Sequence, residues 1–218
     1  LTFKFSDIHS IYARDINIRK FYEESNIEDD LIYEEKRTAL HGLFKCLENK
    51  FLVNKPWHED LFDNKILQSM EAGKFGLRTP KTLITSQPLK FLEFYEKCNK
   101  KVVIKQLSEV CMIESLNSNI DMSLEHEKAY GFYTSKVTAD FLEDINQIEN
   151  APCLFQEFIP KTADIRSTVI GGKIYSAFID SQIHEQSKVD FRKIVDLPMR
   201  EFSLPIDVSN NLLKLLRK

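Results

Sequence analysis

Two adjacent glycines between strand-like segments constrain this chain more than any other local feature. Arg166–Ile170 and Lys173–Asp180 are both rich in β-branched and aromatic residues, and only Gly171-Gly172 separates them. A two-residue hairpin turn of the primed type needs positive φ at its central positions, which glycine adopts without steric cost. The sequence therefore predicts an antiparallel hairpin, and this excludes an all-helical fold.

The rest of the chain mixes helical and extended patterns. Apolar residues at spacings of three and four predict helices, and short β-branched or aromatic runs predict strands. We expect helices over 31–47, 63–75, 89–98, 139–149 and from 208 onward, a buried strand over 51–53, and strands over 101–105 and 154–159. Ser86 is the expected cap of the third helix and Pro88 its first residue. Residues 110–136 are polar and poor in glycine, and we expect a mobile hairpin or lid there, which could also dock the peptide. The fold class is therefore α+β, with two or more lobes.

Composition and charge exclude several classes of function. The 218 residues include 16 Phe and 7 Tyr, which supply enough apolar surface for a core, so disorder is excluded as the main state. No apolar run approaches the roughly 20 residues of a membrane-spanning helix. The 30 basic and 33 acidic residues are interspersed and give a net charge of -3. Neither nucleic acid nor a membrane is therefore an expected partner.

The cysteines indicate a reducing compartment. Cys46, Cys98, Cys111 and Cys153 are far apart, form no C-x-x-C pair and have no histidine at zinc-ligand spacing. Scattered thiols of this kind are usual in the cytoplasm, which is the expected location.

Two lysines could bind an anion. Lys105 ends a strand of Val and Ile, from which its ammonium could hold a phosphate as a point charge. Lys65 lies in the first turn of a helix, where a cation is unfavourable unless an anion is near. Taken singly, both are explained equally well as solvated surface residues. The chain has no G-x-x-x-x-G-K-[ST] and no G-x-G-x-x-G motif, so phosphate binding would depend on lysine and arginine side chains.

An acid-x-Arg pattern occurs twice around the hairpin. Asp164 and Arg166 are two residues apart on a strand and so share a face, and the pattern recurs at Asp190 and Arg192. An Asp on a ribose hydroxyl and an Arg on a phosphate or carboxylate would use such a placement. A surface ion pair is the alternative for either pair.

The order of six segments resembles the ATP-grasp ligases. In chain order they are Asn64-Lys65, Gly76 to Thr82, Val102 to Lys105, Gln156 to Ile159, Asp164 to Arg166 and Asp190 to Arg192. Each segment is weak alone, and their common order makes the set specific. The resemblance implies an ATP-grasp fold, in which two α+β lobes grip ATP after a partial α/β N-terminal lobe.

Within this superfamily the chain is similar to the microviridin-type, or graspetide, maturases of ribosomal peptides. The similarity lies in Ile104 to Val110, in Tyr133-Thr134, in Ala177 to Gln182 and in the glycine-poor lid. It implies an enzyme that uses ATP and Mg²⁺ to activate Asp or Glu side chains of a precursor peptide as acyl phosphates. Thr, Ser or Lys of the same peptide would then form an ester or amide macrocycle. The implied partner is a precursor peptide with its leader.

The resemblance also implies how the nucleotide is held. Lys65 and Lys105 would bind the phosphates of ATP. Glu157 and Phe158 would form the hinge strand that holds adenine, largely through backbone groups, and Asp164 would bind the ribose.

Two arginines would serve the reaction itself. Arg192 and Arg166 would face the transferred phosphoryl group or the substrate carboxylate, because phosphoryl transfer needs charge neutralisation and alignment. In this family an acidic residue and a Glu-x-Asn pair on late strands bind magnesium, and nothing after Arg192 matches them. No residue of the chain is therefore assigned to the metal, and we expect those ligands beyond its last residue. On this view residues 1–79 are part of an N-terminal lobe, 80–160 the central lobe and 161–218 the start of the C-terminal lobe.

Two other functions stay open. A ligase of the same fold could add free amino acids to a protein or small molecule, since Gln156 to Arg166 also resembles the ribosomal-protein glutamate ligases. A module of this fold could instead bind a nucleotide or peptide without catalysis. The sequence leaves the ring chemistry and the oligomeric state open, a homodimer included.

Overall fold

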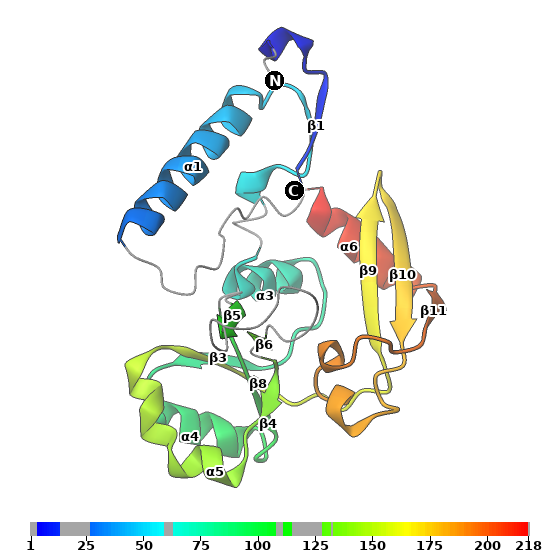
Figure 1. The fold of residues 1–218 in the computed structure, drawn as a ribbon. Helices are drawn as coiled ribbons and strands as arrows, with labels where there is room; N and C mark the ends of the chain where they lie inside the picture. The colour runs from blue at the N-terminus through cyan, green and yellow to red at the C-terminus, as the bar shows by residue number, and fades with distance from the viewer. Residues whose placement is uncertain are drawn as a thin grey trace. The chain divides into compact units, whose positions relative to one another are not determined.

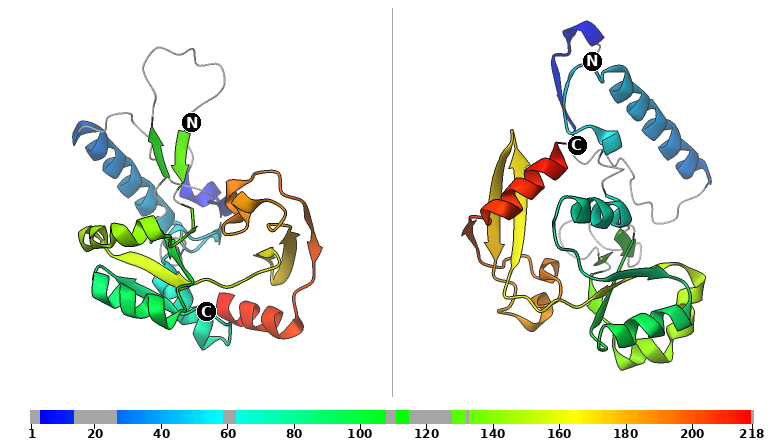
Figure 2. Two further views of the ribbon diagram at one scale, coloured as in Figure 1. Left: turned by 90° about the horizontal axis from the view of Figure 1, so that it is seen from below. Right: turned by 180° about the vertical axis from the view of Figure 1, so that it is seen from behind.

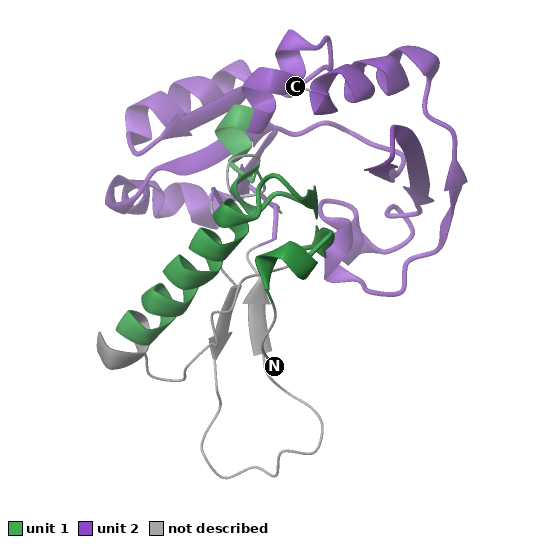
Figure 3. Cartoon of the chain, turned by 90° about the horizontal axis from the view of Figure 1, so that it is seen from above, with its two compact units in different colours: residues 1–67, 111–130 green, residues 68–110, 131–218 purple. Residues whose placement is uncertain are grey.

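The structure is a computed structural model of the chain and describes residues 4–13, 27–58, 63–107, 111–114, 128–131 and 133–217. Internal contacts divide it into two compact units (Figure 3). Unit 1 comprises residues 1–67 and 111–130, and unit 2 comprises residues 68–110 and 131–218. No helix among the described residues is long and apolar enough to cross a membrane.

Unit 1 contains one long helix and a short pair of parallel strands. The helix α1 (Ile27–Cys46) confirms the helix expected over 31–47. The strand β2 (Phe51–Val53) forms as expected and pairs with β1 (Ser10–Tyr12), after the short 3-10 turn η1 (Phe5–Asp7). The expectation that β2 is buried is wrong, because Phe51 is 71% exposed. A two-stranded pair of this length has too little neighbouring sheet to cover its side chains.

The expected lid is described only in part. The strands β5 (Cys111–Glu114) and β6 (Lys128–Gly131) form a two-stranded sheet. Residues 115–127 and 132 lie outside the described residues, and so do Ser108 to Val110 of the segment that resembles the maturases. The lid therefore stays an expectation.

A four-stranded antiparallel sheet forms the first part of unit 2, in the order β3-β8-β4-β7. Its strands are β3 (Thr82–Thr85), β8 (Cys153–Glu157), β4 (Val102–Lys105) and β7 (Ser135–Lys136). β4 and β8 confirm the strands expected over 101–105 and 154–159. The helices α4 (Pro88–Lys97) and α5 (Ala139–Glu143) lie on one face of this sheet with the 3-10 turn η2 (Ile145–Asn150) (Figures 1 and 2).

The core between this sheet and its helices is aromatic. Phe91 of α4 is fully buried, and its ring centroid lies 4.4 Å from that of Phe155 on β8. The rings of Tyr95 and Phe141 flank it at 5.7 and 5.9 Å. These contacts hold the two helices on the sheet and leave its opposite face for other groups.

Side-chain hydrogen bonds just before α4 and α5 determine where these helices begin. α4 begins at Pro88 as expected, but its cap is Gln87 and the expected cap Ser86 is wrong. The reason is a turn one residue earlier, because Thr85 Oγ1 accepts from Gln87 N–H at 3.0 Å. The helix expected over 139–149 forms as α5 and η2 in succession, with Thr138 Oγ1 capping α5 by accepting from Phe141 N–H.

The helix α3 (Lys65–Lys74) confirms the helix expected over 63–75. Asn64 Oδ1 caps it by accepting from the N–H groups of Ile66 and Leu67 at 3.0 and 3.1 Å. Gly76 follows with a φ of 75°, the left-handed conformation that ends a helix without strain.

The glycine hairpin is confirmed in the second part of unit 2. β9 (Asp164–Ile170) and β10 (Lys173–Ile179) pair in antiparallel register, and Gly171 and Gly172 have φ of 56° and 80°. β11 (Met199–Phe202) pairs with the outer edge of β10, after the short 3-10 turns η3 (Glu185–Ser187) and η4 (Phe191–Lys193). α6 (Ile206–Leu216) then crosses one face of this three-stranded sheet (Figure 1). Helices and antiparallel sheets together confirm the α+β class.

Candidate functional site

Two lysines lie on the face of the four-stranded sheet opposite α4 and α5, a face whose central residues Val103 and Leu154 are themselves buried. Ile104 packs against the aromatic core, so its neighbour Lys105 faces the other way, because side chains alternate along a strand. Lys136 on β7 lies directly opposite Val103 in the register, which puts it on the same face as Lys105. This face therefore carries positive charge from two neighbouring strands.

An aromatic ring lies beside these lysines. Phe158 directly follows β8, and its ring centroid is 4.5 Å from Lys136 Nζ, within cation–π distance. Phe158 N–H donates to Lys101 O at 2.8 Å, which fixes the backbone of this residue at the end of the sheet. A flat apolar surface next to cations suits a purine with its phosphates.

Glu157 has a structural partner on β3. Its Oε1 accepts from Lys81 N–H at 3.0 Å, its Oε2 lies 3.1 Å from Lys81 Nζ, and its own N–H donates to Lys81 O at 3.0 Å. The hydrogen bonds from the Lys81 backbone and side chain hold the pKa of Glu157 below its ordinary value, and the same contact raises the pKa of Lys81. The N–H groups of both Glu157 and Phe158 are used within the sheet. A base bound at the hinge would therefore meet other backbone groups of this segment.

Asp164, the first residue of β9, is held by a lysine of the hinge segment, residues 158–163. Lys161 Nζ lies 2.9 Å from Asp164 Oδ1 and 2.7 Å from Oδ2, and also donates to Val189 O at 3.1 Å. Oδ2 is buried and, among the described residues, accepts no hydrogen bond of its own. An acceptor of this kind fits a sugar hydroxyl. Arg166 lies on the same face of β9, opposite Ala177, and is exposed.

Arg192 is held by a bidentate ion pair. Its Nε and Nη2 donate to Asp190 Oδ1 and Oδ2 at 2.9 and 2.6 Å. The Asp190 side chain is 5% exposed and that of Arg192 is 58% exposed, so the guanidinium protrudes while its partner is hidden. Arg192 Cζ and Lys193 Nζ also lie 5.9 and 5.8 Å from the centroid of the Tyr133 ring.

Hydrogen bonds join these groups across unit 2. Lys161 connects Asp164 to Val189, and the next residue, Asp190, accepts from Thr134 N–H at 2.9 Å. The strand β7, which carries Lys136, begins directly after Thr134. The name junction is used below for the ends of β4 and β8, residues 133–136, the hinge segment with the start of β9, and residues 189–193.

The junction includes most of the residues expected from the sequence. Lys105, Glu157, Phe158, Asp164 and Arg192 lie on its strands and loops, and Arg166 lies two residues into β9. Lys65 is the first residue of α3 and belongs to unit 1, so the structure does not join it to the others.

Two junction residues escape prediction from the sequence, Lys136 and Lys161. Asp190 is indicated by its acid-x-Arg pattern, and Tyr133 lies in a segment that resembles the maturases. Lys136 lies in a strand too short to give a periodic pattern. Lys161 lies three residues before its partner Asp164 outside any helix, where that spacing carries no general meaning.

The described residues contain no group of three or more His, Cys, Asp or Glu side chains that could hold a metal ion. No described residue is assigned to magnesium.

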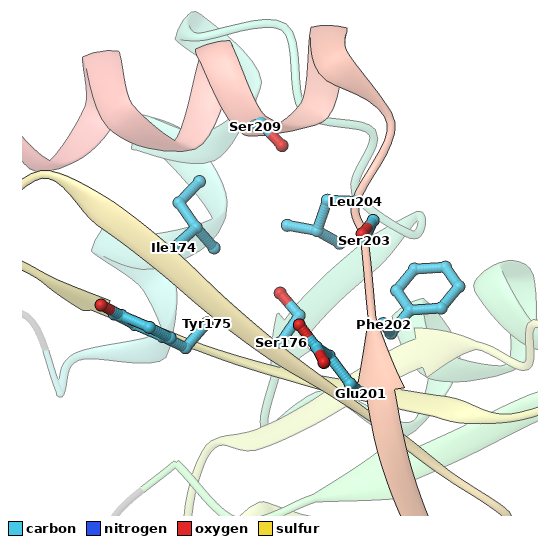
Figure 4. A pocket seen from close by; sticks show the side chains of 8 residues that line it. All are labelled: Ile174, Tyr175, Ser176, Glu201, Phe202, Ser203, Leu204 and Ser209. Atoms are coloured by element: carbon cyan, nitrogen blue, oxygen red, sulfur yellow. The ribbon is translucent and has the colours of Figure 1, made fainter.

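Two surface hollows lie away from the junction. One, of about 350 Å³, lies between α6 and the hairpin sheet and is lined by Ile174, Tyr175, Ser176, Glu201, Phe202, Ser203, Leu204 and Ser209 (Figure 4). The other, of about 390 Å³, lies beside α5 and η2. No residue expected to bind or react from the sequence lines either hollow. The candidate site is therefore defined by its charged groups and hydrogen bonds and not by either hollow.

Comparison with solved structures gives matches over nearly the whole chain. A RiPP-associated ATP-grasp ligase of Chryseobacterium gregarium, in complex with ADP and a leader and core peptide, aligns with 97% of this chain at a TM-score of 0.79 and 27% identity. The macrocyclase MdnC of Microcystis aeruginosa, bound with precursor peptide MdnA, aligns with 98% at a TM-score of 0.77 and 23% identity. The ATP-grasp ligase PsnB, complexed with a minimal precursor, aligns with 96% at a TM-score of 0.71 and 19% identity.

The chain matches only part of each of these three proteins. This chain covers 61%, 64% and 62% of the lengths of those three proteins. No protein-family model matches the sequence, and no curated protein does. Because the sequence identities are low, it is the structural alignment that identifies the fold.

Proposed function

The chain has the ATP-grasp fold, and on this premise we propose that it is the nucleotide-binding part of an ATP-dependent ligase that cross-links a ribosomal precursor peptide. The observation that carries the proposal is the junction: cations, a buried acceptor and an exposed, oriented arginine lie together within this fold. Among the similar structures, the Chryseobacterium ligase holds ADP with a leader and core peptide, and PsnB holds AMPPNP with its precursor peptide or Mg and ADP with a minimal precursor. The charged groups of the junction suit such ligands.

Lys105 and Lys136 would hold the phosphates of ATP. Both lysines lie on the face of the sheet opposite the aromatic core, and the phosphate oxygens carry charge that a lysine can neutralise. Lys65 is retained as a third phosphate ligand from unit 1. Neutralising the phosphates lowers the cost of bringing a second anion, the peptide carboxylate, to the terminal phosphorus.

The hinge segment and Phe158 would hold the adenine and ribose. The Phe158 ring provides an apolar surface for the base, and the backbone around Glu157 provides its polar contacts. Asp164 Oδ2 would accept a hydrogen bond from a ribose hydroxyl, which would satisfy a buried oxygen that accepts none among the described residues.

Arg192 and Arg166 would face the reacting groups. A carboxylate oxygen of an Asp or Glu in the peptide attacks the terminal phosphorus of ATP, the bond to ADP breaks, and an acyl phosphate forms. A Thr or Ser hydroxyl or a Lys amine of the same peptide then attacks the acyl carbon. Phosphate leaves, and the peptide has lost one water for each ester or amide ring. Planar guanidinium groups suit the carboxylate and phosphoryl oxygens in both steps.

Mg²⁺ would accompany ATP and neutralise charge on its phosphates. We derive no step from it, because the described residues form no site for the ion. The three described cysteines Cys46, Cys98 and Cys153 are free thiols, in keeping with a reaction in the cytoplasm.

The decisive experiment incubates the full-length protein with ATP, Mg²⁺ and a co-encoded peptide rich in Thr and Glu. The proposal expects ADP release and loss of one water per ring from the peptide, measured by mass spectrometry. A mass gain would identify a ligase that adds free amino acids. Nucleotide binding without ADP release would identify a non-catalytic module, and an unchanged peptide mass under all conditions would reject the proposal.

A further inference from the structure

Asp190 accepts four hydrogen bonds from two distant parts of the sequence. Its two oxygens accept from Arg192 N–H, Nε and Nη2 at 3.2, 2.9 and 2.6 Å and from Thr134 N–H at 2.9 Å. The side chain is 5% exposed. Burial alone would raise its pKa, but these hydrogen bonds and the Arg192 charge outweigh burial and hold the pKa far below its ordinary value. Asp190 is therefore an ionised carboxylate hidden from solvent.

The bidentate pair fixes the direction of the Arg192 guanidinium. A guanidinium has five N–H donors in one plane, and Asp190 accepts from Nε and from one of those on Nη2. The buried Asp190 carboxylate therefore fixes the plane of the Arg192 guanidinium and the direction of the N–H groups that it does not bind. The Tyr133 ring, 5.9 Å from Arg192 Cζ, flanks the same guanidinium.

The fourth hydrogen bond connects this arginine to a different part of the sequence. Thr134 is 56 residues before Asp190 and directly precedes β7, the strand of Lys136. One carboxylate thus holds both the arginine and the segment leading into the lysine-bearing sheet.

We propose that Asp190 is a positioning residue for the ligase reaction, which orients Arg192 and, through Thr134, fixes that arginine relative to the phosphate-binding lysines. This inference rests on the proposed function. Asp190 itself would touch neither nucleotide nor peptide, because it is buried beneath the guanidinium that it holds.

The test compares Asp190→Asn, Arg192→Met and the double variant in the full-length protein. Asparagine is nearly isosteric, but it is neutral and has one acceptor oxygen, so its NH2 group would face one of the N–H donors that Asp190 now binds. We expect Asp190→Asn to lower kcat roughly 10- to 100-fold while the KM for ATP changes less than about 3-fold. If Asp190 acts through Arg192, the double variant is no slower than Arg192→Met alone. Losses that multiply in the double variant, or an Asp190→Asn variant with wild-type kcat, would overturn the inference.

Hydrogen exchange distinguishes the contact of Asp190 with Thr134 from its contact with Arg192. The amide of Thr134 should exchange faster in Asp190→Asn and stay protected in Arg192→Met, where the carboxylate remains. Asp180→Asn is the matched control, because Asp180 Oδ2 forms a looser ion pair, 3.9 Å from Nη1 of another arginine, Arg200. Equal Thr134 exchange in wild type and Asp190→Asn would exclude the contact to β7.

A second variant covers the case in which Asp190→Asn does not fold. Arg192→Lys keeps the charge but loses the planar fork, so it should be slowed about as much as Arg192→Met. Wild-type kcat in Arg192→Lys would overturn the orienting role. A wild-type protein that forms no cross-link instead rejects the proposed function, so the two failures are distinct.

Discussion

Lys105 owes its candidate role to the strand that carries it. On a flexible loop the same lysine would be a solvated cation, but β4 pairs on both edges and points this side chain to the face opposite the core. Lys136 reaches the same face from the neighbouring strand. The position of Lys105 could be expected from the Val-Ile run before it, whereas that of Lys136 depends on sheet pairing that a two-residue strand does not reveal.

Replacing Lys105 tests the phosphate site. We expect Lys105→Met to weaken ATP binding about 10- to 100-fold, the loss of one charged hydrogen bond of ~1.5–3 kcal/mol. Isothermal titration calorimetry with ATP measures the change. Lys97→Met, at the exposed end of α4, is the control and should bind ATP like the wild type. Unchanged affinity in Lys105→Met would count against this site.

Phe91 carries the core of the four-stranded sheet. It is fully buried and contacts three other aromatic rings, so Phe91→Ala should lower the free energy of unfolding by about 3–5 kcal/mol. Urea denaturation followed by fluorescence or circular dichroism measures the loss. Leu92→Ala on the same helix removes a side chain that is 39% exposed and should cost distinctly less. Equal losses would mean that this core is not organised around Phe91.

At the scale of elements, the hairpin was the most predictable part of the fold. Gly171-Gly172 specifies its own turn, because few other residues tolerate both φ angles. Other elements depended on their surroundings. Phe51–Val53 has the composition of a buried strand, yet it is exposed, since burial requires neighbours that the local sequence does not encode.

The turn itself gives a test without steric complications. Apart from the neighbouring residues in the chain, no atom of the described residues lies within 4 Å of a Cβ built on Gly172, whose φ is 80°, so we expect a substitution there to act through backbone strain. We expect Gly172→Val to lower the free energy of unfolding by roughly 1–2 kcal/mol and to speed amide exchange in β9 and β10. Gly172→Asn should lose less, because asparagine tolerates positive φ. Equal stability of Gly172→Val and wild type would argue against this turn.

At the scale of the whole molecule, the contacts that build the junction join distant positions. Lys81 N–H meets Glu157 across 76 residues, and Thr134 N–H meets Asp190 across 56. Sequence patterns predict residue types and local elements, and the family resemblance predicted which residues matter. Neither reveals that Glu157 is held by Lys81 or Asp164 by Lys161, because such pairs form only when the chain is folded.

The carboxylates of Glu157 and Asp190 make the stability of the protein depend on pH. The pKa values of Glu157 and Asp190 lie below their ordinary values of 4.5 and 3.8. Their contribution to stability is therefore fully present above those values and is lost as the pH falls toward the lower folded-state values. We expect Tm to fall steadily below about pH 5 and Glu157→Gln to flatten that dependence, measured by calorimetry over this range. Glu93→Gln, from an exposed ion pair with Lys90, is the control and should leave the slope unchanged. A Glu157→Gln profile parallel to wild type would contradict this expectation.

Two hydrogen-bonded residues of the hinge segment, Phe158 and Lys161, also limit the movement of the two parts of unit 2 relative to each other. On one side Phe158 N–H is anchored to Lys101 O, and on the other Lys161 is anchored to Asp164 and Val189. Ile159 and Pro160 are left between the anchors, and the proline ring fixes its own φ near −65°. In mechanical terms a short, stiff connection joins the two parts of unit 2. It favours one position of the loop that carries Arg192 relative to the four-stranded sheet.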